Sequence, residues 1–488
     1  MKERYILEGR EPFEVLKRFE DICSIPHGSG HEGKLGEFVI SIAEEHGYPW
    51  ERDDTGNILI RIPASTGCES APSMCIQGHL DMVLAKKDWV ELDMVNEPIE
   101  LILEGNVLRA NGTTLGADNA VGLCNMLAVM DHPELRHPPL ELLFTVSEEV
   151  GLVGMRAFDL TKLRSRRMLN MDMGDPGLLE ISSAGTSKIR FKKAFERLGI
   201  PDGSICLSTA IKGLRGGHSG LETGKNRGDA VEIISRILSE ITENVPGARL
   251  SAIRSPEVSA GIPSFASVEY VIPSVSRGLA DQLTDTFRQI LSRELVDDPD
   301  MELVTEEISL PESVLSERDT VLVSDFLLTI PKGVFRRNEK HLNWVTSSST
   351  LSIVRLDSEG LYAYMSYRVN DDAFREGIES RIRSVCRMTE VGYEIEKGAP
   401  AWPESRDSVL RRKAKEVYFG LFGEEMTEDS CHGSVEVSVA AAGIPDMEII
   451  GTAPYSRGAH TPDEWLDLDS IGPFWEYLKA LLSSLAEG

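Results

Sequence analysis

Seven histidine and carboxylate side chains lie at the ends of apolar segments of the chain or in the loops that follow them. Ligand-binding groups of an open α/β sheet lie beyond the strand ends, so we expect these side chains to converge. Imidazole and carboxylate groups are the ligands that Zn²⁺, Co²⁺ and Mn²⁺ use in proteins. The sequence therefore predicts a metal centre that draws on His79, Asp81, Asp118, Glu148, Glu149, Asp172 and His460.

Local spacing gives neighbouring members of this set different roles. His79 and Asp81 are two residues apart, so in an extended segment they point to the same side and the carboxylate can orient the imidazole. Glu148 and Glu149 are adjacent and diverge in an extended chain. We therefore expect Asp81 to support a ligand, and one glutamate to bind metal while the other faces the reacting water.

Charge counting favours two metal ions over one. As ligands, Asp118, Glu149 and Asp172 carry three negative charges, and a bridging hydroxide adds a fourth. Two divalent cations balance this charge, whereas a single ion leaves the site strongly anionic. Such a pair activates the bridging water and polarises a scissile carbonyl. We expect Glu148 to be the general base that later returns the proton to the leaving amine.

Each of these patterns has an ordinary structural explanation when it is taken alone. A histidine beside an aspartate is commonly a surface or capping pair, and acidic pairs are common among 79 acidic residues. The loop GTTLGADN (112–119) matches neither a P-loop nor a dinucleotide-binding motif. Four successive apolar strands that all end in ligand-type residues are what favours a functional site.

The elements that position these residues alternate between apolar strands and helices, which predicts an α/β fold with a mixed sheet flanked by helices. From about residue 188 the pattern changes to antiparallel strands with amphipathic helices, typical of an inserted α+β domain. We predict a catalytic domain of residues 1–187 and 402–488 and a lid or dimerisation domain of 188–401. We predict strands at 57–62, 73–83, 140–146 and 168–173, and helices at 120–130, 408–422 and 470–485.

The chain has 488 residues and a formal net charge of −28, and its length suits two or three domains. Such an acidic surface repels phosphate backbones and anionic lipids, so we predict no nucleic-acid and no membrane partner. No apolar run approaches the about 18 residues of a membrane span, and the N-terminus has no signal-peptide pattern. Seven scattered cysteines fit a reducing compartment, and we predict a cytoplasmic protein.

The motifs HLDMV, GTTLGADN, SEE, NMD and AHTPDE resemble, in order and wording, the co-catalytic zinc hydrolases that include aminoacylases, carboxypeptidases and dipeptidases. The resemblance is strongest to the bacterial aminoacyl-histidine dipeptidases, also called Xaa-His dipeptidases or carnosinases. It runs nearly end to end, from CSIPHGSGHEGKLGEF through KGLRGGHSG to GAHTPDE. It implies a zinc-peptidase-like catalytic domain with an inserted lid and two divalent ions, zinc by expectation, with cobalt or manganese as alternatives.

The resemblance implies a ligand set in which each ion has one imidazole and two carboxylates. His79 and Asp172 would hold the first ion. Glu149 and His460 would hold the second, and Asp118 would bridge the two.

The resemblance also implies four residues that act on a small peptide substrate. His218, in GGHSG, would bind the carbonyl oxygen as it becomes an oxyanion, which requires the inserted domain to close over the catalytic domain. In dimeric relatives this histidine comes from the partner subunit, and we expect a homodimer through the inserted domain. Arg368 would grip the C-terminal carboxylate, and His432 and Glu436 would line the substrate pocket.

Three segments depart from the pattern of the relatives, and all concern substrate choice. An Asn-x-Ile-Pro segment is Ala260-Gly261-Ile262-Pro263 here, a Ser-Leu-Asn segment ends at Thr350, and a Gly-Leu-Glu segment begins at Ser434. Loss of polar groups from a substrate pocket changes selectivity strongly. A preference for C-terminal histidine therefore does not follow from the resemblance.

We predict a dipeptidase that cleaves unblocked dipeptides, Xaa-His among them. An N-acyl-amino-acid amidohydrolase with the same metals is the alternative within enzymes. A non-catalytic metal-binding or peptide-binding protein is the second alternative, against which Glu148 argues, because binding requires no base. The acidity of the chain and its lack of a basic phosphate clamp disfavour a two-metal phosphoesterase.

Overall fold

The computed structural model describes residues 5–173, 175–405 and 407–487, and the chain divides into two compact units. Unit 1 comprises Met1–Ser183, Trp402–Cys431 and Val435–Gly488, and unit 2 comprises Ala184–Ala401 and His432–Ser434. The division into a catalytic domain of 1–187 and 402–488 and a lid of 188–401 stays a prediction.

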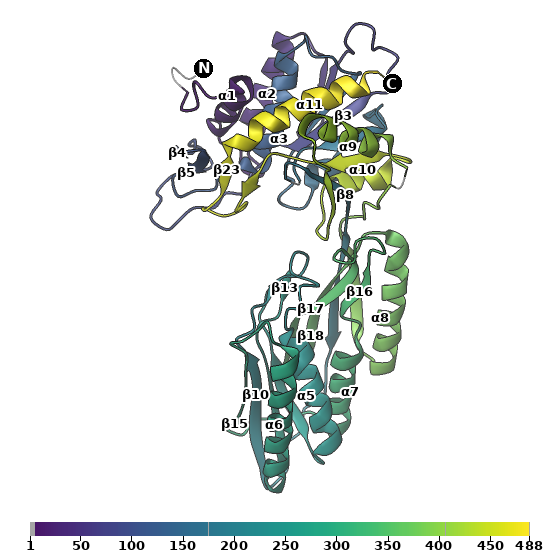
Figure 1. The fold of residues 1–488 in the computed structure, drawn as a ribbon. Helices are drawn as coiled ribbons and strands as arrows, with labels where there is room; N and C mark the ends of the chain where they lie inside the picture. Colours follow the sequence, from purple (N-terminus) through teal and green to yellow (C-terminus); the bar gives the residue numbers. More distant parts are fainter. Residues whose placement is uncertain (1–4, 174, 406, 488) are drawn as a thin grey trace. The chain divides into compact units, whose positions relative to one another are not determined.

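Unit 1 is built on an eight-stranded mixed sheet, which lies among the helices in the upper part of Figure 1. Its central strands pair in parallel, and both β1–β2 and β2–β6 are antiparallel. In spatial order the strands are β1 (Trp50–Arg52), β2 (Ile58–Ile62), β6 (Leu140–Thr145), β3 (Met74–His79), β7 (Arg167–Asn170), β21 (Glu448–Gly451), β8 (Leu178–Ser183) and β20 (Thr427–Cys431).

Helices of unit 1 pack against this sheet and against one another, with α3 on β3, α9 on β21, α1 on α3 and α11 on α9. A four-stranded sheet in the order β22-β23-β5-β4 lies in the same unit. The helices are α1 (Phe13–Cys23), α2 (Gly33–Glu45), α3 (Ala117–Asp131), α4 (Val153–Ala157), α9 (Val409–Phe422), α10 (Val437–Gly443) and α11 (Ile471–Leu485). The strands of the small sheet are β22 (Ser456–Arg457), β23 (Trp465–Asp467), β5 (Val107–Ala110) and β4 (Leu101–Glu104).

Unit 2 is an antiparallel sheet with helices α5, α6 and α7 running side by side along it (Figure 1). Its main strands, in spatial order, are β15 (Glu302–Ile308), β10 (Ser204–Lys212), β14 (Ala266–Pro273), β12 (Arg249–Arg254), β17 (Val345–Asp357), β18 (Gly360–Val369), β9 (Gly185–Lys193) and β19 (Gly392–Lys397). β16 (Gly333–Arg337) pairs with β17, and β11 (Gly217–His218) pairs with β13 (Gly261–Ile262). The helices are α5 (Ala230–Asn244), α6 (Arg277–Glu294), α7 (Glu317–Thr329) and α8 (Arg375–Thr389).

Helix α5 shows why these segments fold as they do. Asp229 precedes it, and its carboxylate accepts the N–H groups of Val231 and Glu232, which caps the first turn. Its buried residues recur at helical spacing and face the sheet, and they include Ile233, Ile237 and Ile241. The same periodicity in the sequence indicates an amphipathic helix over residues 228–242, close to the observed bounds.

The predicted fold class is confirmed, with a helix-flanked mixed sheet in unit 1 and α+β architecture in unit 2. Three boundaries differ from the predictions by three residues or more. The strands predicted over 73–83 and 168–173 end at His79 and Asn170. The helix predicted from residue 120 begins at Ala117, so Asp118 lies within it and not in the preceding loop.

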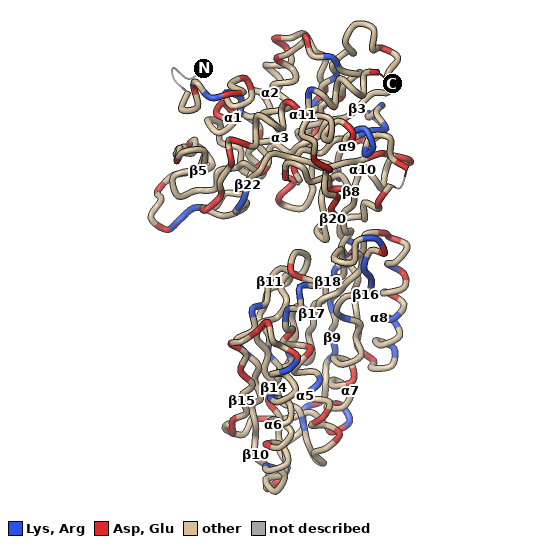
Figure 2. The backbone as a smooth tube through the Cα atoms, in the orientation of Figure 1, with Lys and Arg blue, Asp and Glu red and all other residues tan. Residues whose placement is uncertain are grey.

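Acidic and basic residues are interspersed along the backbone of both units (Figure 2). The net charge of −28 therefore belongs to the whole chain and not to one site. Among the described residues, no helix is both long enough and apolar enough to cross a membrane.

Candidate metal centre

The carboxyl ends of three neighbouring parallel strands meet at one edge of the sheet in unit 1. β3 pairs in parallel with β6 on one side and β7 on the other, and His79 lies opposite Thr145 of β6. β3 is buried over its whole length, which explains its apolar sequence. Because parallel strands end at a common edge, His79 comes together with the residues that follow β6 and β7, namely Glu148, Glu149 and Asp172.

Asp118 reaches this edge from the first turn of α3 and not from the glycine-rich loop 112–119 in which it was predicted. Asp118 and Asn119 lie in the first turn of α3 with backbone angles that are not helical. These backbone angles separate Asp118 from the regular helix that follows.

Two groups of three candidate ligands share Asp118, and the ligand atoms of each group lie within 4.8 Å of one another. In the first group His79 Nε2 lies 3.0 Å from Asp118 Oδ1 and 3.3 Å from Asp172 Oδ1. In the second group His460 Nε2 lies 3.2 Å from Asp118 Oδ2 and 2.8 Å from Glu149 Oε1. The two oxygens of Asp118 thus face different imidazoles, which is the arrangement that a bridging carboxylate needs.

Burial and neighbouring charges shift the pKa values of the ligand-type side chains at this edge. Hydrogen bonds to Asp118 and Glu149 raise the pKa of His460 to about 10. Burial raises the pKa of Asp172 to about 7, and the charge of Asp118 adds to this effect. Burial opposes the charged form of His79, but Asp172 and Asp118 raise its pKa well above the usual value. Divalent cations displace such protons, and the nitrogen and oxygen donors fit a pair of them.

Asp81 is a buried residue that contacts several members of the candidate metal centre. Its carboxylate is 1% exposed, and Oδ1 lies 3.4 Å from His79 Nδ1. The carboxylate also accepts the backbone N–H groups of Glu148 at 2.9 Å and Glu149 at 3.2 Å, and the hydroxyl of Ser29 at 2.7 Å. Burial opposes its ionisation, but the hydrogen bonds from His79, Ser29 and Glu148 hold its pKa below the usual value. Asp81 therefore fixes two segments of the site and not only His79.

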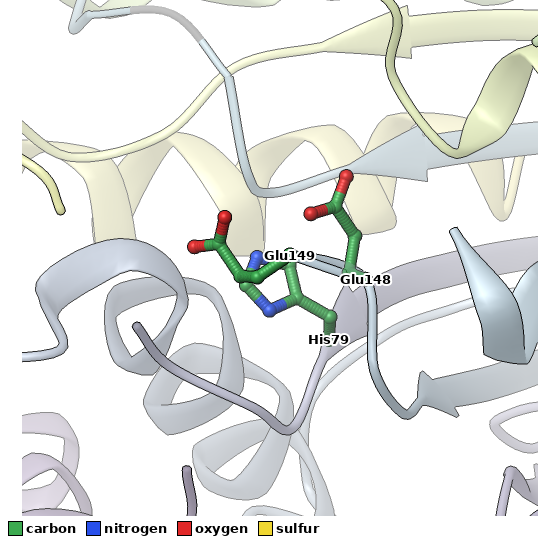
Figure 3. A group of neighbouring side chains, drawn as sticks. All are labelled: His79, Glu148 and Glu149. Carbon is green, nitrogen blue, oxygen red and sulfur yellow. The ribbon is translucent and has the colours of Figure 1, made fainter. Parts of the chain in front are cut away.

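Glu148 and Glu149 diverge from adjacent positions beside His79 (Figure 3). Each offers an oxygen within 4.8 Å of a His79 nitrogen. Burial raises the pKa of Glu148 to about 9, and the neighbouring carboxylates Asp172 and Glu436 contribute. The two side chains therefore present separate carboxyl groups to the centre, and that of Glu149 also pairs with the imidazole of His460.

Glu436 lies in a buried polar cluster. It is 1% exposed, and its Oε1 accepts hydrogen bonds from Gln77 Nε2 and, at 2.8 Å, from Thr145 Oγ1. Gln77 in turn accepts a hydrogen bond from Asn170 at 2.7 Å. These partners lie on β3, β6 and β7, the strands that end at the candidate metal centre. The role of Glu436 in substrate binding stays a prediction.

Two carboxylates that hold ligand-bearing loops were missed from the sequence. Glu32 Oε1 accepts the backbone N–H and the hydroxyl of Ser147, directly before Glu148. Glu464 accepts backbone N–H groups from the segment that ends at Asp118. Neither glutamate lies at a recognisable sequence spacing from the loop that it holds, although Glu464 lies in the AHTPDE motif.

The other predicted substrate residues, apart from Glu436, lie in unit 2. His218 is exposed, and its Nδ1 accepts the N–H groups of Gly220 at 3.2 Å and Leu221 at 3.3 Å. Arg368 is buried in β18, with Nη2 3.5 Å from Ser219 Oγ. His432 Nε2 lies 2.7 Å from Ser348 Oγ, and burial together with the charge of Arg368 lowers the pKa of His432 to about 3.

A cavity of about 380 Å³ in unit 2 includes both His218 and the altered segment. Ala260, Gly261, Ile262 and Pro263 line it, and Ala260 presents a methyl group at the position where the family resemblance implies an asparagine amide. At the other altered positions, Thr350 is buried and Ser434 Oγ donates to the carbonyl oxygen of Ala184 at 3.2 Å. These segments are thus ordered parts of unit 2.

Residues 75–484 match the sequence profile of peptidase family M20/M25/M40. The chain is 29% identical over 470 residues to a cytosol non-specific dipeptidase of Escherichia coli, with 96% of each chain covered. The crystal structure of an aminoacylhistidine dipeptidase from Vibrio alginolyticus is similar with a TM-score of 0.93 and 28% identity, covering 99% of this chain and 98% of that one. A tripeptidase from Staphylococcus aureus shares the fold, with a TM-score of 0.56 and 13% identity over 98% of this chain and 99% of that one.

Proposed function

The chain belongs to peptidase family M20/M25/M40, and from this membership we propose that it hydrolyses unblocked dipeptides at a centre of two divalent metal ions. The observation that carries the proposal is the pair of ligand groups that share Asp118. Similarity over nearly the full length to two dipeptidases supports a dipeptide substrate.

We propose that His79 and Asp172 hold one ion, Glu149 and His460 hold the other, and Asp118 bridges them. When bound, two such cations supply a hydroxide nucleophile at neutral pH and a Lewis acid for the scissile carbonyl. Zinc suits this mixture of imidazole and carboxylate, and cobalt or manganese can replace it.

Glu148 is the proposed general base. Bound cations would favour the charged form of this buried carboxyl group. Its carboxylate then takes a proton from the attacking water as the new C–O bond forms, and it gives that proton to the leaving amine as the C–N bond breaks. Asp81 holds the backbone N–H of Glu148 at 2.9 Å, so the base and the ligand Glu149 are positioned by one carboxylate.

Three residues of unit 2 are proposed to bind the substrate. Because Nδ1 of His218 accepts backbone hydrogen bonds, the neutral ring carries its proton on Nε2 and can donate to the carbonyl oxygen. Arg368 would pair with the C-terminal carboxylate of the dipeptide, and His432 would contact the C-terminal side chain. Dipeptides with C-terminal histidine are among the proposed substrates.

A panel of dipeptides and N-acetylated amino acids, assayed with zinc-, cobalt- and manganese-loaded protein, tests the function. We expect hydrolysis of dipeptides and none of N-acetylated amino acids. Glu148→Ala is expected to lose about 100-fold or more of kcat while it retains both ions, because the base is not a ligand.

Each other outcome has a definite meaning. Hydrolysis of N-acetylated amino acids with no dipeptide cleavage would make the protein an amidohydrolase. Two bound ions without hydrolysis of any compound would make it a binding protein. Loss of metal in Glu148→Ala would mean that the roles of Glu148 and Glu149 are interchanged.

We also propose a cytoplasmic homodimer that associates through unit 2. None of the seven cysteines, all of which lie in the described residues, forms a disulfide, which suits a reducing compartment, and the similar Escherichia coli protein is named as cytosolic. Light scattering at several concentrations measures the mass, and a monomer of 53.9 kDa would exclude the dimer.

A further inference from the structure

Glu464 links two candidate metal ligands that are far apart in the sequence. It lies four residues after His460 and is only 2% exposed. Its Oε2 accepts the backbone N–H groups of Leu115 at 2.7 Å and Gly116 at 2.8 Å, and its Oε1 accepts that of Asp118 at 3.2 Å. One carboxylate thus receives three N–H groups from the segment that presents Asp118.

We propose that Glu464 is a positioning residue that sets the bridging ligand Asp118 and the ligand His460 relative to each other. The inference rests on the proposed function, in which both residues bind metal. It goes further by assigning the geometry of the shared ligand to a residue that binds neither metal nor substrate.

The segment before Asp118 needs such a partner. Helix N-termini leave N–H groups without helical acceptors. The N-cap residue of α3 is Gly116, which has no side chain to accept a hydrogen bond from them. Gly116 has φ 71° and Asp118 is not helical, so regular helix geometry does not fix the aspartate. Three hydrogen bonds to the carboxyl group of Glu464 supply these missing acceptors and hold residues 115–118 in place.

The same residue restrains the second ligand. The N–H of Glu464 donates to the carbonyl of Thr461 at 3.1 Å, and the N–H of Thr461 donates to that of Gly458 at 3.2 Å, so the loop is folded back on itself. His460 lies inside this loop with φ 66°, a left-handed conformation that a non-glycine residue adopts only when its surroundings hold it. A displacement of Glu464 therefore moves Asp118 and His460, two of the three ligands of the group that also contains Glu149.

Glu141 provides a matched control within the same unit. It is 3% exposed, and its carboxylate accepts the backbone N–H groups of Arg164 and Ser165. It lies four residues before Thr145 on β6, so roughly 13 Å separates it from the strand ends. Glu141→Gln therefore makes the same chemical change to a similar buried carboxylate away from the metal centre.

The test compares Glu464→Gln and Glu141→Gln in the full chain. Glutamine has the same shape but only one acceptor oxygen, so in either orientation an NH₂ group faces a backbone N–H. Metal-free protein is titrated with Co²⁺ against a chromophoric chelator. Glu464→Gln is expected to bind the weaker ion about 10- to 100-fold less tightly, the usual effect of losing a residue that supports a ligand. Glu141→Gln is expected to bind both ions as the wild type does.

The outcomes separate this inference from the proposed function. Wild-type protein that binds no Co²⁺ would remove the proposed function itself. If the wild type binds two ions and Glu464→Gln binds them with the same affinities as the wild type, the positioning role alone is overturned. An equal loss of Co²⁺ affinity in Glu464→Gln and Glu141→Gln would overturn it as well. If Glu464→Gln is not recovered folded, hydrogen exchange of wild-type peptide 112–118 decides, because a preformed support protects these amides without metal. Fast exchange in the metal-free wild type would overturn the inference.

Discussion

Replacing Asp81 with asparagine tests which part of the centre this carboxylate controls. The side chain receives hydrogen bonds from Ser29, Glu148 and Glu149, and it lies 3.4 Å from His79 Nδ1. Asparagine has one acceptor oxygen, so its NH₂ group must replace one carboxylate oxygen. The hydroxyl of Ser29 can turn and accept from NH₂, so we expect the NH₂ group to take the position that faces Ser29 and Glu149.

This orientation concentrates the loss on the N–H of Glu149. The tautomer of His79 is kept, because Nδ1 also lies 3.0 Å from the backbone carbonyl of Asp81. Loss of one hydrogen bond to a charged group, with its donor left buried, costs about 1.5–3 kcal/mol. Since 1.4 kcal/mol is tenfold, the ion held by Glu149 and His460 should bind about 10- to 100-fold less tightly.

The assay is a Co²⁺ titration of metal-free protein in a double-mutant cycle. His460→Ala removes one ligand of the affected group, so Asp81→Asn should change the affinity of the remaining ion by less than about threefold in that background. Ser29→Ala is the control, because it removes a donor to Asp81 but no support of a ligand. A full 10- to 100-fold loss in the His460→Ala background would refute the reasoning, because Asp81 would then act through His79.

Two further predictions concern stability. Removal of metal by a chelator should lower the unfolding temperature, since four carboxyl groups lie close together at the centre. Metal at 100 times its dissociation constant should restore about 2.7 kcal/mol, and calorimetry that shows no change would contradict this. Arg411 and Lys415 hold the pKa of Glu428 at about 2. A lowered carboxyl pKa stabilises the fold above the unfolded-state value and loses this effect as the pH falls. Glu428→Gln should thus cost about 1–2 kcal/mol at pH 7, and the difference from wild type should shrink between about pH 4.5 and pH 2. A pH-independent difference in urea unfolding would exclude this mechanism.

The strand ends of the candidate metal centre could be predicted because β3 and β6 are buried on both faces. Such strands are mainly apolar, and a histidine or carboxylate at their ends is conspicuous. Helix boundaries near the C-terminus were also predictable, because apolar residues recur at helical spacing. The helix predicted over 408–422 is observed as Val409–Phe422.

Features that depend on backbone groups of distant segments could not be predicted. The chain places β21 between β7 and β8, although more than 260 residues separate β8 from β21 in the sequence. Glu464 acts through N–H groups, which every non-proline residue carries, so no residue pattern marks its partners. Among 79 acidic residues, a carboxylate of this kind is not conspicuous.

The discontinuity of unit 1 has a consequence for biosynthesis. During translation the first 183 residues leave the ribosome without β20, β21 or His460, and the roughly 220 residues of 184–401 follow before these segments appear. At about 5–20 residues per second this interval lasts about 10–40 s. Asp118 and His460, 342 positions apart, meet only when the chain is nearly finished. If Asp118 and His460 bind metal as proposed, a nascent chain of this kind cannot assemble the ligand group that contains them, and peptide hydrolysis begins only after synthesis is almost complete.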